Sequence, residues 1–140
     1  MIDLLCWHNA QQGQFHPIKR QGHTCVPYQQ SMILFGGYSG QPVGDMWFLD
    51  TSTKYYCFST SNLSIAKLRW TRFEPTGAKP GKRTGHTAVI IKDKMYIFGG
   101  ETGLKCANDL WVFDICNYSF SFSTHFQSSK NVDTSRILRF

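Results

Sequence analysis

The chain of 140 residues contains two copies of one unit, and this internal repeat limits its fold more than any other feature. When residues 20–37 are laid over residues 83–100, nine of the 18 positions hold the same amino acid. About one match would be expected by chance. After one inserted residue the match continues, pairing Asp45 with Asp109, Trp47 with Trp111 and Asp50 with Asp114. Such a repeat predicts two copies of the same supersecondary structure.

Each copy has the pattern of several short β-strands separated by turn residues. The predicted strands are Thr87–Ile91, Met95–Phe98 and Asp109–Phe113 in the second copy, with a fourth around Trp70–Phe73 in the first. The continuous apolar run of residues 87–91 predicts a strand that is buried on both faces. No segment shows a sustained helical period, so an all-β protein is expected.

An ordered series of motifs occurs in both copies and resembles the kelch repeat, which is one blade of a β-propeller. The first copy has Arg20-x-Gly-His-Thr24, Phe35-Gly-Gly37 and Asp45-Met-Trp47; the second has Arg83-x-Gly-His-Thr87, Phe98-Gly-Gly100 and Asp109-Leu-Trp111. The resemblance implies two four-stranded antiparallel blades of an incomplete propeller, plus an N-terminal outer strand near Leu4–Trp7.

This resemblance divides the chain into four parts. Residues 1–19 are expected to hold the outer strand and a connection, 20–73 the first repeat, 74–82 a linker loop and 83–140 the second repeat. An insertion is predicted near 57–68. The last strand is predicted at 136–140, because Arg136-Ile-Leu-Arg-Phe140 echoes Arg69-Trp-Thr-Arg-Phe73. Pro27 falls within a predicted first strand, which the resemblance places at the inner edge of the sheet, where a missing N–H can be tolerated.

The length is short for this architecture. A closed propeller of four to eight blades, each of about 50 residues, needs roughly 200 to 400 residues. The aromatic content of 15% suits blade faces that pack against neighbouring blades. Two blades alone leave faces uncovered, so self-association to complete a propeller is one possibility, and a truncated, non-functional fragment is another.

The net charge of +6 is concentrated in one segment. Residues 67–83 carry six basic side chains and one acidic side chain: Lys67, Arg69, Arg72, Lys79, Lys82, Arg83 and Glu74. We interpret this segment mainly as a solvated outer strand and loop, with an acidic protein partner as the alternative. Nucleic-acid binding is not favoured, since the neighbouring aromatic residues are predicted to lie within a strand.

No motif for catalysis, cofactor binding or metal binding is found. Phosphate-binding glycine loops and nucleophile elbows are missing, and the five cysteines contain no C-x-x-C pair, so reduced thiols are expected. His23 and His86 occupy equivalent repeat positions, which favours a structural role. With no transmembrane run and no secretory signal, a cytoplasmic or alternatively nuclear protein without membrane binding is predicted.

The kelch resemblance implies a protein–protein interaction module, a non-catalytic scaffold or adaptor. Its partner surface is expected on the propeller face that carries the loops between second and third strands and the connections between blades. The predicted contact residues are Tyr38, Ser39, Gln41, Thr76, Lys79, Lys82, Glu101, Thr102, Leu104 and Lys105. A fragment of a metal-dependent kelch-type oxidase is a remaining alternative; no catalytic or metal-binding residue could be assigned.

Overall fold

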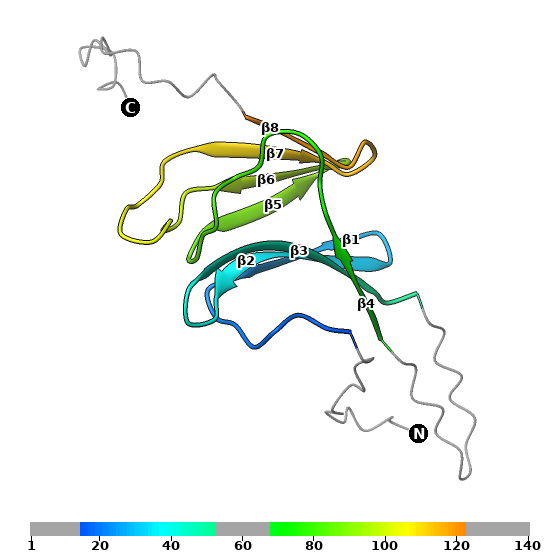
Figure 1. Cartoon of the computed structure of the whole chain (residues 1–140). Coiled ribbons are helices and arrows are strands. Elements are labelled where there is room, and N and C mark those ends of the chain that lie inside the picture. The colour runs from blue at the N-terminus through cyan, green and yellow to red at the C-terminus, as the bar shows by residue number, and fades with distance from the viewer. Residues whose placement is uncertain (1–14, 53–67, 123–140) are drawn as a thin grey trace, which may run out of the picture.

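The computed structural model describes residues 15–52 and 68–122, which form two four-stranded antiparallel sheets (Figure 1). The first sheet contains β1 (Thr24–Tyr28), β2 (Ser31–Tyr38), β3 (Pro42–Asp50) and β4 (Arg69–Phe73). The second contains β5 (Thr87–Ile91), β6 (Lys94–Phe98), β7 (Leu110–Asp114) and β8 (Ser119–Phe122). In each sheet the strands lie side by side in chain order, and no helix occurs in the described ranges. The all-β fold and its two kelch-type blades are confirmed.

Tight hairpins set the register of both sheets. Tyr28 pairs with Ser31 across the first turn, and Ile91 pairs with Lys94 across the equivalent turn in the second sheet. Gln29 and Lys92 occupy these turns with φ angles of 53° and 56°, a left-handed conformation that a polar turn residue can adopt. Pro27 lies in β1, a sheet edge, where its missing N–H breaks no inner ladder.

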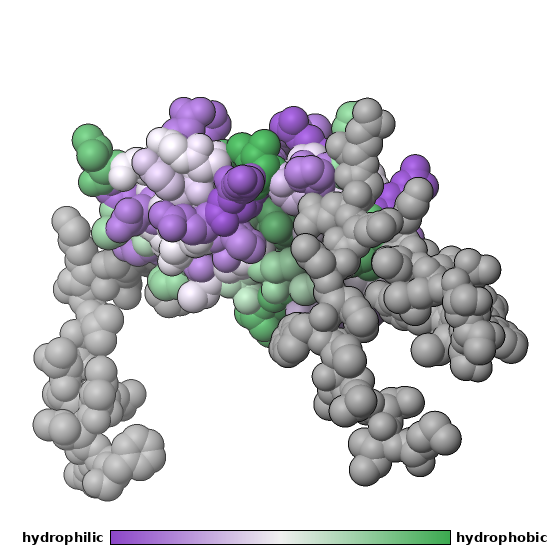
Figure 2. All heavy atoms as spheres, turned by 90° about the horizontal axis from the view of Figure 1, so that it is seen from below, coloured by the Kyte–Doolittle hydropathy of each residue, from purple (hydrophilic) through white to green (hydrophobic). Residues whose placement is uncertain are grey.

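The two sheets stack face to face and enclose one hydrophobic core. Its fully buried centre includes Ile33 and Phe35 of β2 and Met95 and Ile97 of β6, in which every second residue points inward. Phe73 at the end of β4 meets Phe113 of β7 with 5.7 Å between ring centroids. Viewed from the β1–β4 side, hydrophobic side chains gather in the middle of the surface with hydrophilic ones beside them (Figure 2).

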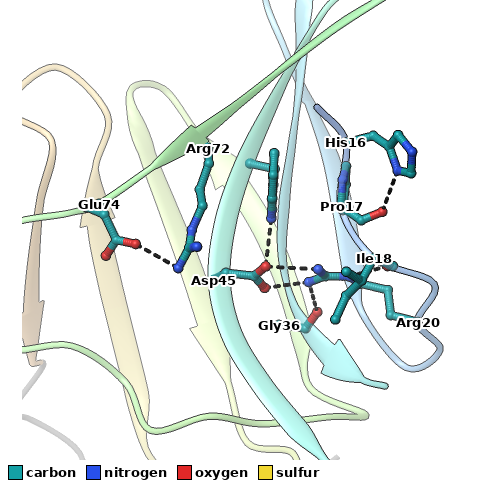
Figure 3. A network of polar contacts seen from close by, with 9 residues as sticks. His16, Pro17, Ile18, Arg20, Gly36, Asp45, Arg72 and Glu74 are labelled. Atoms are coloured by element: carbon teal, nitrogen blue, oxygen red, sulfur yellow. Dashed lines mark hydrogen bonds and ion pairs between the residues drawn. The ribbon is translucent and has the colours of Figure 1, made fainter. Parts of the chain in front are cut away.

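A buried ion pair stabilises the same corner of each sheet. Arg83 is 1% exposed, and its two terminal nitrogens donate to the carboxylate of Asp109 at 2.7 and 2.9 Å. Arg83 also donates to Gly99 O, while Trp111 Nε1 donates to the same carboxylate. Figure 3 shows the equivalent cluster of the first sheet, where the Arg20 guanidinium faces Asp45 and also reaches Gly36 O. This shared geometry explains why the arginine and the Asp-x-Trp motif repeat together.

Backbone contact between the sheets requires a glycine at position 36. Gly36 has a φ of +63°, and a Cβ there would lie 2.8 Å from Arg83 O and 2.9 Å from His86 Cε1. Next to it, Gly37 N donates to Arg83 O at 2.8 Å, and Gly85 N donates to Gly22 O at 2.8 Å. These bonds tie the connection before β5 to the first sheet.

Two details of the sequence prediction are wrong. Residues 87–91 form a strand as expected, but Val89 and Ile91 are 50% and 56% exposed, because the second sheet is covered on one face only by the described residues. The fourth strand of the second sheet is 119–122 rather than 136–140, since a short turn returns the chain directly along β7. The outer strand near Leu4–Trp7, most of the insertion near 57–68 and the segment 136–140 lie outside the described residues.

Candidate functional site

The loops between second and third strands lie at the same end of the two sheets (Figure 1). Tyr38 ends β2, and its backbone exchanges hydrogen bonds with Gln21. Glu101, in the β6–β7 loop, exchanges hydrogen bonds with Thr84, whose neighbour Arg83 donates its N–H to Val43 O at the start of β3. The connection before β5 therefore holds the two loops together at this end.

Most of the predicted contact residues come together there. Within the loops, Ser39 N donates to Gln41 O and Thr102 N donates to Lys105 O, while the Leu104 side chain is fully exposed. Lys82 packs against the start of β3, because a Cβ on Gly44 would lie 3.2 Å from Lys82 Cα. These contacts place the loop residues and Lys82 on one surface.

The predicted contact residue Thr76 does not lie at the loop end of the sheets. Its N–H donates to Tyr118 O at 3.0 Å, and it forms an isolated bridge with Ser119 at the start of β8. Ser119 pairs with Asp114, which is the end of β7 opposite to the β6–β7 loop. The connection thus first runs along the outer strand of the second sheet and only then reaches the loop end.

A pocket of about 360 Å³ opens between the sheets under this connection. Phe35, Phe73 and Phe120 give it apolar walls, and Lys79 and Lys82 line it from the connection. The remaining lining comes from the start of β3, the end of β4 and the two prolines of the connection: Val43, Gly44, Asp45, Arg72, Glu74, Pro75 and Pro80. Apolar walls with a few charged groups are typical of ligand-binding pockets.

The charges around the pocket are only partly paired. Glu74 accepts from Arg72 at 3.0 Å and from Lys79 at 3.3 Å, and all three side chains are largely solvent-exposed (Figure 3 shows the Arg72 contact). Burial works to raise the pKa of Asp45, but hydrogen bonds from Arg20 and Trp47 hold that pKa below its usual value. Lys82 forms no ion pair within the described ranges. A net positive charge therefore remains at the pocket.

The basic segment identified in the sequence is not one continuous basic surface. Arg83 is buried against Asp109 and contributes nothing to the exterior. Arg72, Lys79 and Lys82 do reach the pocket, and Lys67 lies outside the described residues. Sequence reasoning missed Arg72 and Glu74 as pocket residues, although the charge count of segment 67–83 contained both of them.

The two repeated histidines differ in their surroundings. His86 is 5% exposed, and its Nε2 lies 2.7 Å from Thr24 Oγ1 of the first sheet. Burial, followed by the nearby charge of Arg83, lowers the pKa of His86 to about 4. His23 is exposed. The structural role predicted for the repeat position is thus seen at His86, where the ring joins the two sheets.

Two further observations concern metals and membranes. The described ranges contain no group of three or more His, Cys, Asp or Glu side chains placed to hold a metal ion. In the same part of the chain, no helix is long and apolar enough to cross a membrane.

Comparison with known proteins agrees with this architecture. The family model described as the KLHDC2/KLHL20/DRC7 kelch-repeats domain matches residues 1–134. The chain is 35% identical over 109 residues to tip elongation aberrant protein 1 of Schizosaccharomyces pombe. This alignment covers 78% of this chain and 9% of that protein. It is 32% identical over 104 residues to the host cell factor homolog hcf-1 of Caenorhabditis elegans, covering 69% of this chain and 12% of the relative.

Human host cell factor 2 is 36% identical over 90 residues, or 60% of this chain and 10% of its own length. The chain thus spans about a tenth of the length of these curated relatives. The match over nearly all residues, the repeated motifs and the two stacked four-stranded sheets lead to one conclusion: the chain belongs to the kelch-repeat family.

Proposed function

We propose that this chain is a non-catalytic protein-interaction module, which binds a partner at the loop end of its two blades. The observation that carries the proposal is the pocket between the sheets, with its phenylalanine walls and the adjacent Lys79 and Lys82. Kelch-repeat membership supports an interaction role in general terms. The partner surface includes Tyr38, Ser39, Gln41, Glu101, Thr102, Leu104 and Lys105 of the flanking loops.

The chemistry of the pocket favours an acidic peptide segment with an apolar side chain. Phe35, Phe73 and Phe120 would receive the apolar group, and Lys82 would attract a nearby carboxylate. Burial of an aromatic or aliphatic side chain supplies most of the affinity in such a site, while the charged rim adds specificity and association rate. A scaffold or adaptor role and a cytoplasmic or nuclear location stay predictions.

The test is selection of binders from a random peptide library, followed by fluorescence polarisation with the enriched peptides. We expect enrichment of peptides that combine Asp or Glu with Phe, Leu or Trp. The variant Lys79→Glu/Lys82→Glu should weaken their binding at least about tenfold. Lys92→Glu/Lys94→Glu, at the opposite end of the second sheet, is the matched control and should bind normally. Equal binding to both variants, or enrichment without acidic residues, would refute the proposed site.

A further inference from the structure

The two sheets stack in a head-to-tail manner, so that they contribute opposite faces to the shared core. Val26, Ile33 and Phe35 of the first sheet point into the core. Their repeat equivalents in the second sheet are Val89, Tyr96 and Phe98, which point away from it, because Ala88, Met95 and Ile97 are the inward residues. The contact between the sheets is therefore not symmetric.

The outer face of the β5–β8 sheet repeats the chemistry of an already covered face. Each outer residue corresponds to an inward residue of the first sheet: Val89 to Val26, Ile91 to Tyr28, Tyr96 to Ile33, Phe98 to Phe35, Leu110 to Met46 and Val112 to Phe48. Val89 and Ile91 are half exposed or more. A contiguous apolar sheet face of this kind is typical of an interaction surface.

The opposite end of the stack carries the complementary face. The outer residues of the β1–β4 sheet are Cys25, Pro27, Met32, Leu34, Trp47 and Leu49. Their repeat equivalents are Ala88, Ile90, Met95, Ile97, Trp111 and Phe113, which are the residues that cover the first sheet. Pro27 is exposed and Met32 and Trp47 are half-buried, so these three residues form the accessible part of the face, whereas Leu34 and Leu49 are already buried within the chain. This is the side of the molecule seen in Figure 2.

Each sheet also carries on its outer side one of the two residue types that form a polar contact between the sheets. Within the chain, Thr24 of the first sheet bonds to His86 at the entry of the second. The repeat equivalent of Thr24 is Thr87, which is exposed on the second sheet, and the equivalent of His86 is His23, which is exposed on the first. Neither side chain has a hydrogen bond within the described residues.

The glycine that admits a neighbouring sheet is repeated too. Gly36 is approached by Arg83 O and His86 of the second sheet. Its equivalent Gly99 has the same left-handed φ of +66°, but a Cβ there would meet only Ala107 O at 3.3 Å. A Cβ at Gly99 would therefore meet only its own sheet's loop, whereas a Cβ at Gly36 would meet the neighbouring sheet.

From this correspondence we infer that the outer face of the β5–β8 sheet binds the outer face of the β1–β4 sheet of a second copy of this chain. The contact repeats the one inside the chain, with Thr87 of one copy beside His23 of the next. Such a head-to-tail contact uses two different surfaces and leaves one of each free at the ends, so association continues until a ring closes. This surface is separate from the loop end and its pocket.

The first measurement is sedimentation equilibrium of the full chain between about 1 and 100 μM, a range in which weak specific contacts are populated. We expect the average mass to rise with concentration. Val89→Lys should abolish the rise by placing a charge in the contact, and Met32→Lys should do the same from the opposite face. Leu104→Lys replaces an equally apolar exposed residue outside both faces and should associate normally.

Mixing the two face variants decides the geometry. Val89→Lys retains an intact β1–β4 face and Met32→Lys an intact β5–β8 face, so together they should form a one-to-one dimer that grows no further. Recovery of association also shows that both variants are folded. A wild-type chain that stays monomeric, a single variant that still dimerises, or an inert mixture of variants with wild-type circular dichroism would overturn the inference.

His23→Ala and Thr87→Ala test the polar contact. Each should weaken association about fivefold through loss of one hydrogen bond, and combining them should add nothing further. Normal association of both variants would show that the sheets do not pair in this register, and this result would overturn the inference.

Discussion

Removal of the carboxylate of Asp109 tests how the second sheet is stabilised. The Arg83 guanidinium is 1% exposed, and among residues 15–52 and 68–122 it forms its ion pair with Asp109 alone. In Asp109→Ala the guanidinium keeps Gly81 O and Gly99 O as acceptors but loses both charged bonds, and Trp111 Nε1 loses its acceptor. Breaking a buried ion pair on one side costs about 3–5 kcal/mol.

We expect the lower end of this range, about 3 kcal/mol, because Asp109 is 26% exposed and two carbonyl acceptors remain. With a urea m-value of about 2 kcal/mol/M, the unfolding midpoint should fall by about 1.5 M. The measurement is urea unfolding followed by circular dichroism, which does not depend on the environment of Trp111.

Glu74→Ala is the control, because Glu74 forms its ion pairs at the exposed surface. Glu74 accepts from Arg72 and Lys79 at comparable distances, but its side chain is 64% exposed, so its loss should cost at most about 1 kcal/mol. The double variant Arg83→Met/Asp109→Leu should be more stable than Asp109→Ala, because no unpaired charge is left inside. Equal effects of Asp109→Ala and Glu74→Ala would refute the assignment of stability to burial of the pair.

The stability of the protein at acid pH should also depend on the Arg83–Asp109 ion pair. The hydrogen bond from Arg83 holds the pKa of Asp109 below its usual value. The stability that this shift supplies is present above the unfolded-state pKa near 3.8 and is lost as the pH falls through the lower folded-state pKa. Asp109→Ala should lack this component of acid unfolding, which is checked by urea titrations at decreasing pH.

Three more predictions follow from the interface between the sheets. Gly36→Ala should cost at least about 2 kcal/mol more than Gly40→Ala in urea unfolding, because both have positive φ but only a Cβ at position 36 meets the neighbouring backbone. Phe113→Ala should cost about 3–5 kcal/mol in thermal unfolding by opening a cavity in the core. Since the pKa of His86 is lowered to about 4, the unfolded chain binds a proton first and stability should fall between pH 6.5 and 4; His86→Gln should remove this slope from stability-against-pH curves.

Much of the fold was predictable from local chemistry. A continuous run of apolar and β-branched residues located the strand Thr87–Ile91 correctly, and the polar residues after it marked the hairpin turn. The fourth strand of the second sheet was misplaced, because the similarity of residues 136–140 to the first β4 outweighed the nearer Ser119–Phe122 segment. Sequence similarity between repeats does not measure how soon a turn can bring the chain back.

The candidate site was predicted only in part. The loops at Tyr38 and Glu101 were expected on one surface, and the backbone bonds through Arg83 and Thr84 join them there. Thr76 was expected beside them but lies at the Tyr118–Ser119 turn. The path of a loop depends on its contacts with the neighbouring sheet, and these contacts are not evident from the loop sequence. Its individual residues therefore cannot be assigned to a surface before the position of that sheet is known.

By itself, the sequence determined the two units, their strand order and the residues that share each strand face, because side-chain alternation and turn chemistry are local properties. Only the tertiary structure decided which face of each unit is covered. Arg83 is charged in the sequence and yet buried, while Val89 and Ile91 are apolar and yet exposed. The physical reason is that burial depends on the neighbouring sheet, and the two units of this chain stack with opposite faces in contact.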